Sequence, residues 1–226
     1  MPTGVQPRRA VLLFARAPGL EARLKGLAKA ERLFRFVTAR IREAAEACGA
    51  QLVVVGAGPS ALPQRGRNFG ERMSAAFADV FSLGFESVAA VGLDAPGLTA
   101  KELQGAFFAL ERGAVALGPT PDGGAYLIGL REHDQELLEG VRWQSRHTLR
   151  DLRERAGQRA VQLLTPLRDL DAPADLPAAW AEAEASWAPL LEACLGRGSG
   201  PPPSVELAAG ILLPRVLSIR GPPARL

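Results

Sequence analysis

Aspartate residues occur in three short segments, and in one of them Asp94 is placed where a carboxylate could hold a divalent cation against a diphosphate. Asp94 closely follows the apolar run 87–92, Asp122 precedes two glycines, and Asp169 and Asp171 alternate along a third segment. The alternation places the side chains of Asp169 and Asp171 on one side of an extended chain. Carboxylate oxygens are the ligands that Mg²⁺ prefers, and such ions keep coordination positions open for phosphate oxygens. At its position after the apolar run, Asp94 could therefore hold Mg²⁺ or Mn²⁺ against a diphosphate.

Each segment also has a purely structural interpretation. Asp94 could be a turn residue, Asp122 with its two glycines could form a turn, and Asp171 could cap a following helix. Adjacent glycines also let a ligand approach the backbone closely. From the residues alone, both interpretations stay open for all three segments.

The elements that must position these residues follow from the hydropathy pattern. Apolar runs predict strands, and amphipathic stretches between most of them predict helices, as in β-α-β units around a mostly parallel sheet. The predicted strands are 10–15, 51–56, 87–92, 114–118, 125–129 and 161–164. The predicted helices are 27–47, 69–83, 100–110, 145–156 and a segment that begins near Pro173. Asp94 thus lies at the carboxyl end of a buried strand, where open α/β sheets bind ligands.

Two local signals refine this pattern. Thr99 with Glu102 three residues later is typical of a capping box at the start of a helix. Only six residues, 119–124, separate the fourth and fifth predicted strands, which is too short for a crossover helix. We therefore expect these two strands to be antiparallel in an otherwise mostly parallel α/β sheet.

Composition excludes several classes of protein. With 47% hydrophobic and 23% charged residues the chain can bury a core and is not disordered. No apolar stretch approaches the ~18 residues of a membrane span, and the run 10–15 is too short for a signal peptide, so we expect a cytoplasmic protein. Two cysteines and two histidines argue against a disulfide framework or a zinc site.

Charged residues are unevenly distributed along the chain. The first third is rich in arginine, which can attract phosphates, but it lacks the interleaved aromatic residues of nucleic-acid modules, so we expect no nucleic-acid partner.

Residues 196–204 have the Gly, Ser and Pro composition of a linker, and an apolar segment follows. We therefore divide the chain into a domain, 1–195, and an extension, 196–226. The extension is expected to pack on the domain or to mediate homo-oligomerisation.

Taken together and in order, these motifs resemble a bacterial family of nucleotide-diphospho-sugar transferases whose members are labelled selenodomain-associated or glycosyltransferase-like proteins. The family is similar to the GT-A fold, and the resemblance covers about residues 10 to 180. The matching segments are Phe14–Pro18, Gln64–Met73, Gly92–Leu98, Leu117–Gly129, Trp143 and Asp169–Leu176. The segments around Asp94 and Asp122 are the most specific of them.

The resemblance implies a three-layer α/β/α sandwich with a mixed, mostly parallel sheet, and a nucleotide bound over its first half. It implies that Asp94 and Asp122 are catalytic residues, and that Asp94 holds Mg²⁺ or Mn²⁺ together with Asp169 or Asp171. The residues implied for nucleotide binding are Arg16, Pro18, Gly19, Arg23, Gln64 and Gly70. The residues implied for the acceptor or sugar pocket are Gly123, Gly124, Tyr126 and Trp143.

This chain departs from the family pattern in its first loop. The family has Lys-x-Pro followed by Gly-x-x-Lys-Thr-Arg-Leu, whereas here the loop is about two residues shorter and Glu21 and Ala22 stand where Lys-Thr is expected. A carboxylate in place of a cation beside a diphosphate should weaken binding by roughly 1 kcal/mol or more. Arg16, Arg23 and Lys25 are the candidates to compensate. Ala95 also replaces the usual Ser after the metal-binding Asp.

Three functions follow as hypotheses. The first is a metal-dependent transferase that moves a glycosyl group from a nucleotide sugar to a small-molecule acceptor. The second is nucleotidyl transfer of the kind catalysed by cofactor guanylyltransferases. The third is a non-catalytic relative that acts as a binding or assembly module, which the altered first loop and the apolar extension favour.

Overall fold

The computed structural model describes residues 8–56, 58, 61–183, 185 and 187–195. The predicted extension 196–226 lies outside this part of the chain, so its packing and its role in oligomerisation stay predictions. Among the described residues, no helix combines the length and the apolar character needed to cross a membrane.

Six strands form one mixed sheet in the order β2-β1-β3-β5-β4-β6. β1 pairs in parallel with β2 and β3, β4 pairs in parallel with β6, and β5 is antiparallel to both of its neighbours. The predicted antiparallel pair, β4 and β5, is therefore confirmed. The strands are β1 (Arg9–Phe14), β2 (Gln51–Val55), β3 (Ser87–Val91), β4 (Val115–Pro119), β5 (Ala125–Leu130) and β6 (Val161–Leu163).

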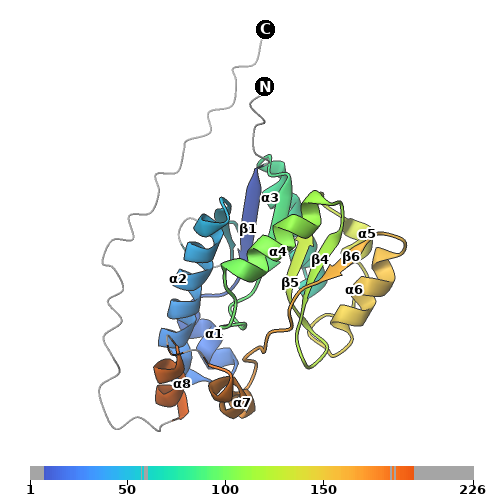
Figure 1. Ribbon diagram of the computed structural model, residues 1–226. Helices are drawn as coiled ribbons and strands as arrows, with labels where there is room; N and C mark the ends of the chain where they lie inside the picture. Colours follow the sequence, from blue (N-terminus) through green and yellow to red (C-terminus); the bar gives the residue numbers. More distant parts are fainter. Residues whose placement is uncertain (1–7, 57, 59–60, 184, 186, 196–226) are drawn as a thin grey trace.

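Helices cover both faces of the sheet (Figure 1). One face carries α1 (Pro18–Leu24), α2 (Glu31–Ala47), α4 (Ala100–Glu111), α7 (Leu176–Ala181) and α8 (Ala188–Leu195). The other face carries α3 (Phe69–Ser82), α5 (Gln135–Leu138) and α6 (Thr148–Ala156). The three-layer α/β/α arrangement implied by the resemblance is thus confirmed.

The alternation of side chains along β1 shows why two cores form. Val11 and Leu13 pack into the core beneath α2 and α4, whereas Ala10 and Leu12 pack into the core beneath α3. Successive side chains of a strand point to opposite faces, so a strand covered on both sides is apolar throughout. The apolar runs of the sequence are therefore the strands of this sheet.

The helix starts follow local signals. Thr99 and Glu102 form the predicted capping box at the start of α4, in which the Thr99 amide donates to Glu102 Oε2 at 3.0 Å. Asn68 caps α3 by accepting from the Glu71 amide at 2.9 Å. The segment 18–24 forms α1, which the sequence analysis did not predict; Pro18 in its first turn suits a helix start because proline lacks the amide hydrogen that would be unpaired there.

The segments that carry the predicted site residues meet at one edge of the sheet. β1 and β3 run in parallel and end there, and the turn 120–124 between β4 and β5 lies at the same edge. The chain after β6 then runs back along this edge, because the Leu167 amide donates to Pro119 O at 3.1 Å and the Leu170 amide donates to Asp94 O at 2.8 Å. These two hydrogen bonds place Asp169 and Asp171 opposite the ends of β3 and β4.

Candidate active site

A cavity of about 410 Å³ lies at this edge, within the size range of small-molecule sites. It is lined by the end of β1, by α1, by the loop after β3, by the turn after β4 and by the chain after β6. Most of the residues proposed from the sequence take part in the lining. These are Arg16, Gln64, Asp94, Asp122, Gly124, Tyr126, Trp143, Asp169 and Asp171.

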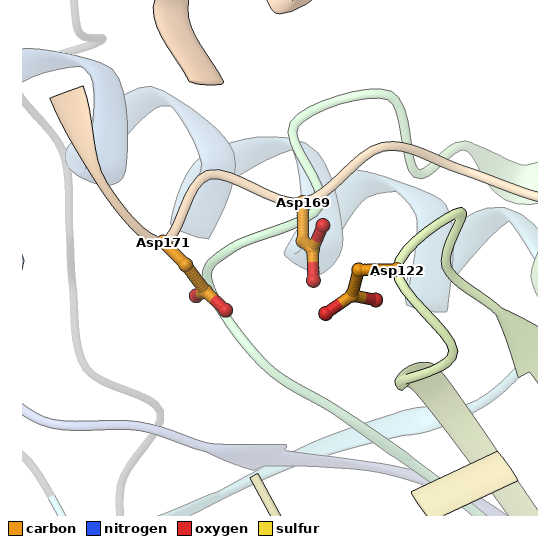
Figure 2. Close-up of side chains that lie close together, drawn as sticks. All are labelled: Asp122, Asp169 and Asp171. Atoms are coloured by element: carbon orange, nitrogen blue, oxygen red, sulfur yellow. The ribbon is translucent and has the colours of Figure 1, made fainter. Parts of the chain in front are cut away.

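Three carboxylates converge within the cavity (Figure 2). Asp122, Asp169 and Asp171, which we term the aspartate trio, each offer an oxygen that lies within 4.8 Å of the other two. Figure 2 shows that Asp122 comes from the β4–β5 turn and the other two from the chain after β6, with the carboxylates directed into a common space. Such a spacing allows one cation to bind all three groups.

The turn that carries Asp122 is held in one conformation. Asp122 Oδ1 accepts hydrogen bonds from the Gly124 amide at 2.9 Å and from the Thr120 hydroxyl. Gly123 has a φ of 93°, and a side chain there would clash with Arg146 O. Glycine is required at this position because other residues rarely adopt positive φ. The turn therefore presents the remaining oxygen of Asp122 to the cavity.

The segment of Asp171 is held by a fourth carboxylate. Asp175 Oδ2 accepts from the amides of Asp171 and Ala172 at 2.9 and 2.7 Å. The residue that precedes the helical turn Pro173–Asp175 is Ala172. The alternative that Asp171 caps this helix is therefore wrong, and its carboxylate is directed to the cavity instead.

Asp169 lies among other negative charges. Burial, together with the negative charges of Asp122, Asp171 and Asp94, raises its pKa to about 7. In the described part of the chain, no lysine or arginine lies within ion-pair distance of Asp169 or Asp122. Oxygen donors with uncompensated negative charge fit a hard divalent cation, so these residues suit Mg²⁺ or Mn²⁺.

Lys25 lies beside the trio and was named from the sequence only as a compensating charge. Its Nζ donates to Leu170 O at 2.8 Å and to Asp171, and lies 3.4 Å from Asp94 Oδ2. Burial alone would lower the pKa of Lys25, but Asp94, Asp171 and Glu21 raise it above its ordinary value. The ammonium group is therefore charged. It is held between Asp94 in the loop after β3 and the chain after β6, which carries Leu170 and Asp171.

Glu21, the carboxylate that breaks the family pattern, is compensated within the cavity. Its carboxylate lies 3.5 Å from Arg16 Nη1 and 3.7 Å from Lys25 Nζ. Arg23, the third candidate for compensation, is exposed and does not line the cavity. Two of the three candidate cations thus accompany Glu21 at the site.

Asp94 occupies a different place from the trio. Its carboxylate faces Lys25, and it is not one of the three groups that share the 4.8 Å spacing. Gly92 permits this position, because a Cβ there would lie 2.6 Å from Asp94 Oδ1. The implied role of Asp94 as a metal ligand stays a prediction, whereas Asp122 now joins Asp169 and Asp171 as a candidate ligand.

Five residues proposed from the resemblance do not line the cavity: Pro18, Gly19, Arg23, Gly70 and Gly123. Pro18 begins α1, and Gly19 packs against the Glu31 carboxylate. Gly70 packs against Trp143, whose Nε1 would lie 2.6 Å from an added Cβ. The glycines thus shape the walls around the cavity. Residues of the lining that the sequence analysis did not single out include Arg72, Gln144, Ser145 and Thr148.

The Tyr126 ring packs directly over Gly118 of β4. Its hydroxyl donates to Thr165 O at 3.0 Å, and burial together with the negative charge of Glu102 raises its pKa. Tyr126 therefore stays neutral and ties β5 to the chain after β6, which positions Asp169.

Replacing Gly118 by alanine should displace this ring. The new Cβ would clash with the ring, so we expect a loss of about 1–3 kcal/mol in the free energy of unfolding, as for other overpacked cores. The matched control is Gly105→Ala in α4, where a Cβ meets only Leu164 Cδ2 at 3.4 Å and helix propensity favours alanine. Urea unfolding compares the two; equal stability of both variants would contradict the packing described.

The loop 141–147 that carries Trp143 is fixed by an ion pair. The Arg142 backbone amide and Nε donate to Asp151 Oδ2 at 2.9 and 2.8 Å, and its Nη2 donates to Asp151 Oδ1 at 2.6 Å. These hydrogen bonds hold the pKa of Asp151 well below its ordinary value.

Because the folded-state pKa of Asp151 is depressed, its contribution to stability is complete above about pH 4 and is lost as the pH falls below that. Asp151→Asn should therefore melt at a lower temperature than the wild type at pH 7. Below about pH 3 the melting temperatures of the two proteins should be closer together. Thermal unfolding at both pH values measures this. A variant that melts like the wild type at pH 7 would show that the pair does not hold the loop.

The chain shares its mixed α/β/α fold with a solved structure. A solved structure from Desulfovibrio desulfuricans G20, described as a "putative nucleotide-diphospho-sugar transferase", is similar with a TM-score of 0.71 and 24% identity, covering 85% of this chain and 99% of that one. Residues 23–145, more than half of the chain, match the model of a family described as "Uncharacterized protein conserved in bacteria (DUF2064)". The chain belongs to this family.

Two further solved structures are more distant. A Mycobacterium tuberculosis rv0371c homolog from Mycobacterium sp. strain JC1 has a TM-score of 0.45 and 14% identity, covering 76% of this chain and 96% of that one. The CMP:2-keto-3-deoxy-manno-octonic acid synthetase complexed with CTP has a TM-score of 0.41 and 11% identity, covering 77% and 98%. No curated protein sequence matches the chain.

Proposed function

We propose that this protein is a metal-dependent transferase that binds a nucleotide-activated donor in the cavity and transfers its glycosyl group to a small-molecule acceptor. The observation that carries the proposal is the aspartate trio beside Lys25 and Arg16 in one cavity. Carboxylates for a divalent cation next to fixed positive charges are the combination that a diphosphate requires.

In this proposal Asp122, Asp169 and Asp171 hold Mg²⁺ or Mn²⁺. The cation, when bound, neutralises negative charge that develops on the departing diphosphate. Lys25 and Arg16 place further positive charge beside the same phosphates, and Arg72 adds a third cation to the lining. Tyr126 and Trp143 border the sugar and the acceptor.

The compensation of Glu21 supports a working site over a decayed one. A carboxylate left alone in the nucleotide pocket would favour the non-catalytic alternative, but Glu21 has two cationic neighbours, at 3.5 and 3.7 Å. The same arrangement of metal and phosphates would also serve nucleotidyl transfer, in which the bond to the α-phosphate breaks instead of the glycosidic bond. The products distinguish the two reactions.

The test is a thermal-shift screen of nucleoside diphosphates, triphosphates and nucleotide sugars, each with and without Mn²⁺. A ligand that binds only the native protein at about 100 times its Kd stabilises it by about 2.7 kcal/mol. We expect a metal-dependent shift with one base. Mass spectrometry of reaction mixtures then separates a free nucleoside diphosphate, the product of glycosyl transfer, from pyrophosphate, the product of nucleotidyl transfer. A folded protein that none of these compounds shifts would contradict the proposal.

A further inference from the structure

A second hollow, of about 830 Å³, adjoins the first cavity on the side of α3 and α5. Phe69, Trp143 and Gln144 line both spaces. The rings of Phe69 and Trp143 lie 5.3 Å apart at 46° and form the wall that the two spaces share. A molecule in the second hollow would therefore lie next to the site proposed for the donor.

The two spaces differ in charge. The lining of the first contains Arg16, Lys25 and Arg72, whereas the described residues that line the second include Glu71 and Glu139 but no lysine or arginine. Glu71 is paired with Arg67 at 2.9 Å, whereas Glu139 forms no ion pair within the described residues, and its carboxylate disfavours a phosphorylated ligand by like-charge repulsion. The second hollow therefore suits an uncharged molecule.

The hydrogen-bonding groups around the second hollow suit hydroxyl groups. Within the described part of the chain, the side chains of Gln135, Glu139 and Gln144 form no hydrogen bond or ion pair, so their oxygens and amide groups stay available. Ser74 Oγ and His133 Nε2, 2.9 Å apart, add a hydroxyl and an imidazole to the same lining. Aromatic faces beside such polar groups accommodate the C–H surfaces of a sugar or polyol.

Gln144 lies at the junction in a strained conformation. Its φ of 55° makes it the one residue other than glycine with a positive φ among those the structure describes. Such strain persists where the surrounding structure enforces it and concentrates at functional sites. Hydrogen bonds on both sides of Gln144 hold its backbone in this conformation. The Ser145 hydroxyl donates to Arg142 O at 2.6 Å, and the Thr148 hydroxyl donates to the same oxygen at 2.9 Å.

We propose that the second hollow binds the acceptor, that the acceptor is an uncharged polyhydroxylated molecule such as a sugar or a polyol, and that the amide of Gln144 determines its specificity at the junction. This inference rests on the proposed transferase function. It places the acceptor in the second hollow and excludes phosphorylated acceptors.

Saturation-transfer NMR with the full-length protein tests the inference, using glucose, N-acetylglucosamine and mannitol against glucose 6-phosphate, each with and without a nucleoside diphosphate and Mn²⁺. Ala75→Phe fills the second hollow, because Ala75 lines it and does not line the first cavity. Ala39→Phe, on α2 across the sheet, is the matched control. Gln144→Gly removes the amide and permits the positive φ.

We expect at least one neutral compound to bind the wild type and the Ala39→Phe variant, and to bind at least tenfold more weakly to Ala75→Phe and Gln144→Gly. The nucleotide affinity of Ala75→Phe, which changes only the second hollow, should stay within twofold of the wild type. Unchanged binding to Ala75→Phe, a preference for glucose 6-phosphate, or no neutral compound bound would overturn the inference. Unchanged binding to Gln144→Gly would overturn the role of Gln144. If the proposed function itself is wrong, the wild type should bind no nucleotide. This result distinguishes failure of the proposed function from failure of the inference about the acceptor.

Discussion

Replacing Asp169 by asparagine should abolish metal-dependent nucleotide binding while leaving the fold intact. The asparagine side chain would keep the shape of the aspartate but would remove a negative charge from the aspartate trio. Changes to groups that merely support metal ligands cost about 10- to 100-fold in affinity, so the loss of a ligand should cost at least ~100-fold. Titration calorimetry with Mn²⁺ and the nucleotide found in the screen measures the change. Asp79→Asn, a carboxylate on α3 that pairs with Arg65, is the control.

In the absence of metal, the same variant should be more stable than the wild type at high pH. The folded-state pKa of Asp169, about 7, lies above its unfolded value, so its ionisation destabilises the metal-free protein at high pH. Metal-free wild type should therefore gain stability as the pH falls from about 8 to about 5, and Asp169→Asn should melt higher than the wild type at about pH 8 and show a weaker pH dependence. A variant that melts lower than the wild type at this high pH in EDTA would contradict the environment assigned to Asp169.

Replacing Lys25 by methionine should cause the largest loss of stability among the site residues. The Lys25 side chain is 12% exposed and faces Glu21, Asp94 and Asp171, which would be left without their common cation. Asp94 and Asp171 are 34% and 60% exposed, so these ion pairs are only partly buried, and we expect a loss of about 1–3 kcal/mol, between that of an exposed and that of a fully buried pair. Urea unfolding at pH 7 measures the loss. Nucleotide affinity should fall in the same variant, because a positive charge beside the phosphates is lost.

Lys101→Met, which changes an exposed lysine at the start of α4, controls for the substitution itself. In the double variant Lys25→Met with Asp94→Asn, one of the unbalanced carboxylates is also neutralised. The double variant should therefore be more stable than Lys25→Met alone, which a double-mutant cycle quantifies. A loss below about 1 kcal/mol for Lys25→Met, the range of an exposed ion pair, would show that the three carboxylates do not depend on this cation.

The fold was predictable because its signals are local. The apolar runs predicted all six strands to within two residues at either end, and the short connection 119–124 predicted the antiparallel pair. The capping box at Thr99 marked the start of α4. The first loop was different, since the helix 18–24 is short and its stability depends on packing against α2, which sequence periodicity does not show.

The candidate site was predictable only in part, because its decisive contacts join distant segments. Asp122, Asp169 and Asp171 were each named from the sequence, but their grouping depends on how the chain after β6 runs back along the sheet. The partnership of Lys25 with Asp94 and Asp171 spans 69 and 146 positions and leaves no periodic signal. Gln144 carries no sequence signal either, since its interest lies in a backbone angle and in the two spaces that it adjoins.

The most direct test of the central claim is titration of Mn²⁺ into the metal-free protein, with and without the nucleotide identified in the screen, followed by electron paramagnetic resonance. The account predicts one Mn²⁺ per chain in the presence of nucleotide, and loss of this ion in Asp169→Asn and in Asp171→Asn. A nucleotide-bound protein that takes up no Mn²⁺, or an ion that both variants retain, would contradict a metal site at the aspartate trio.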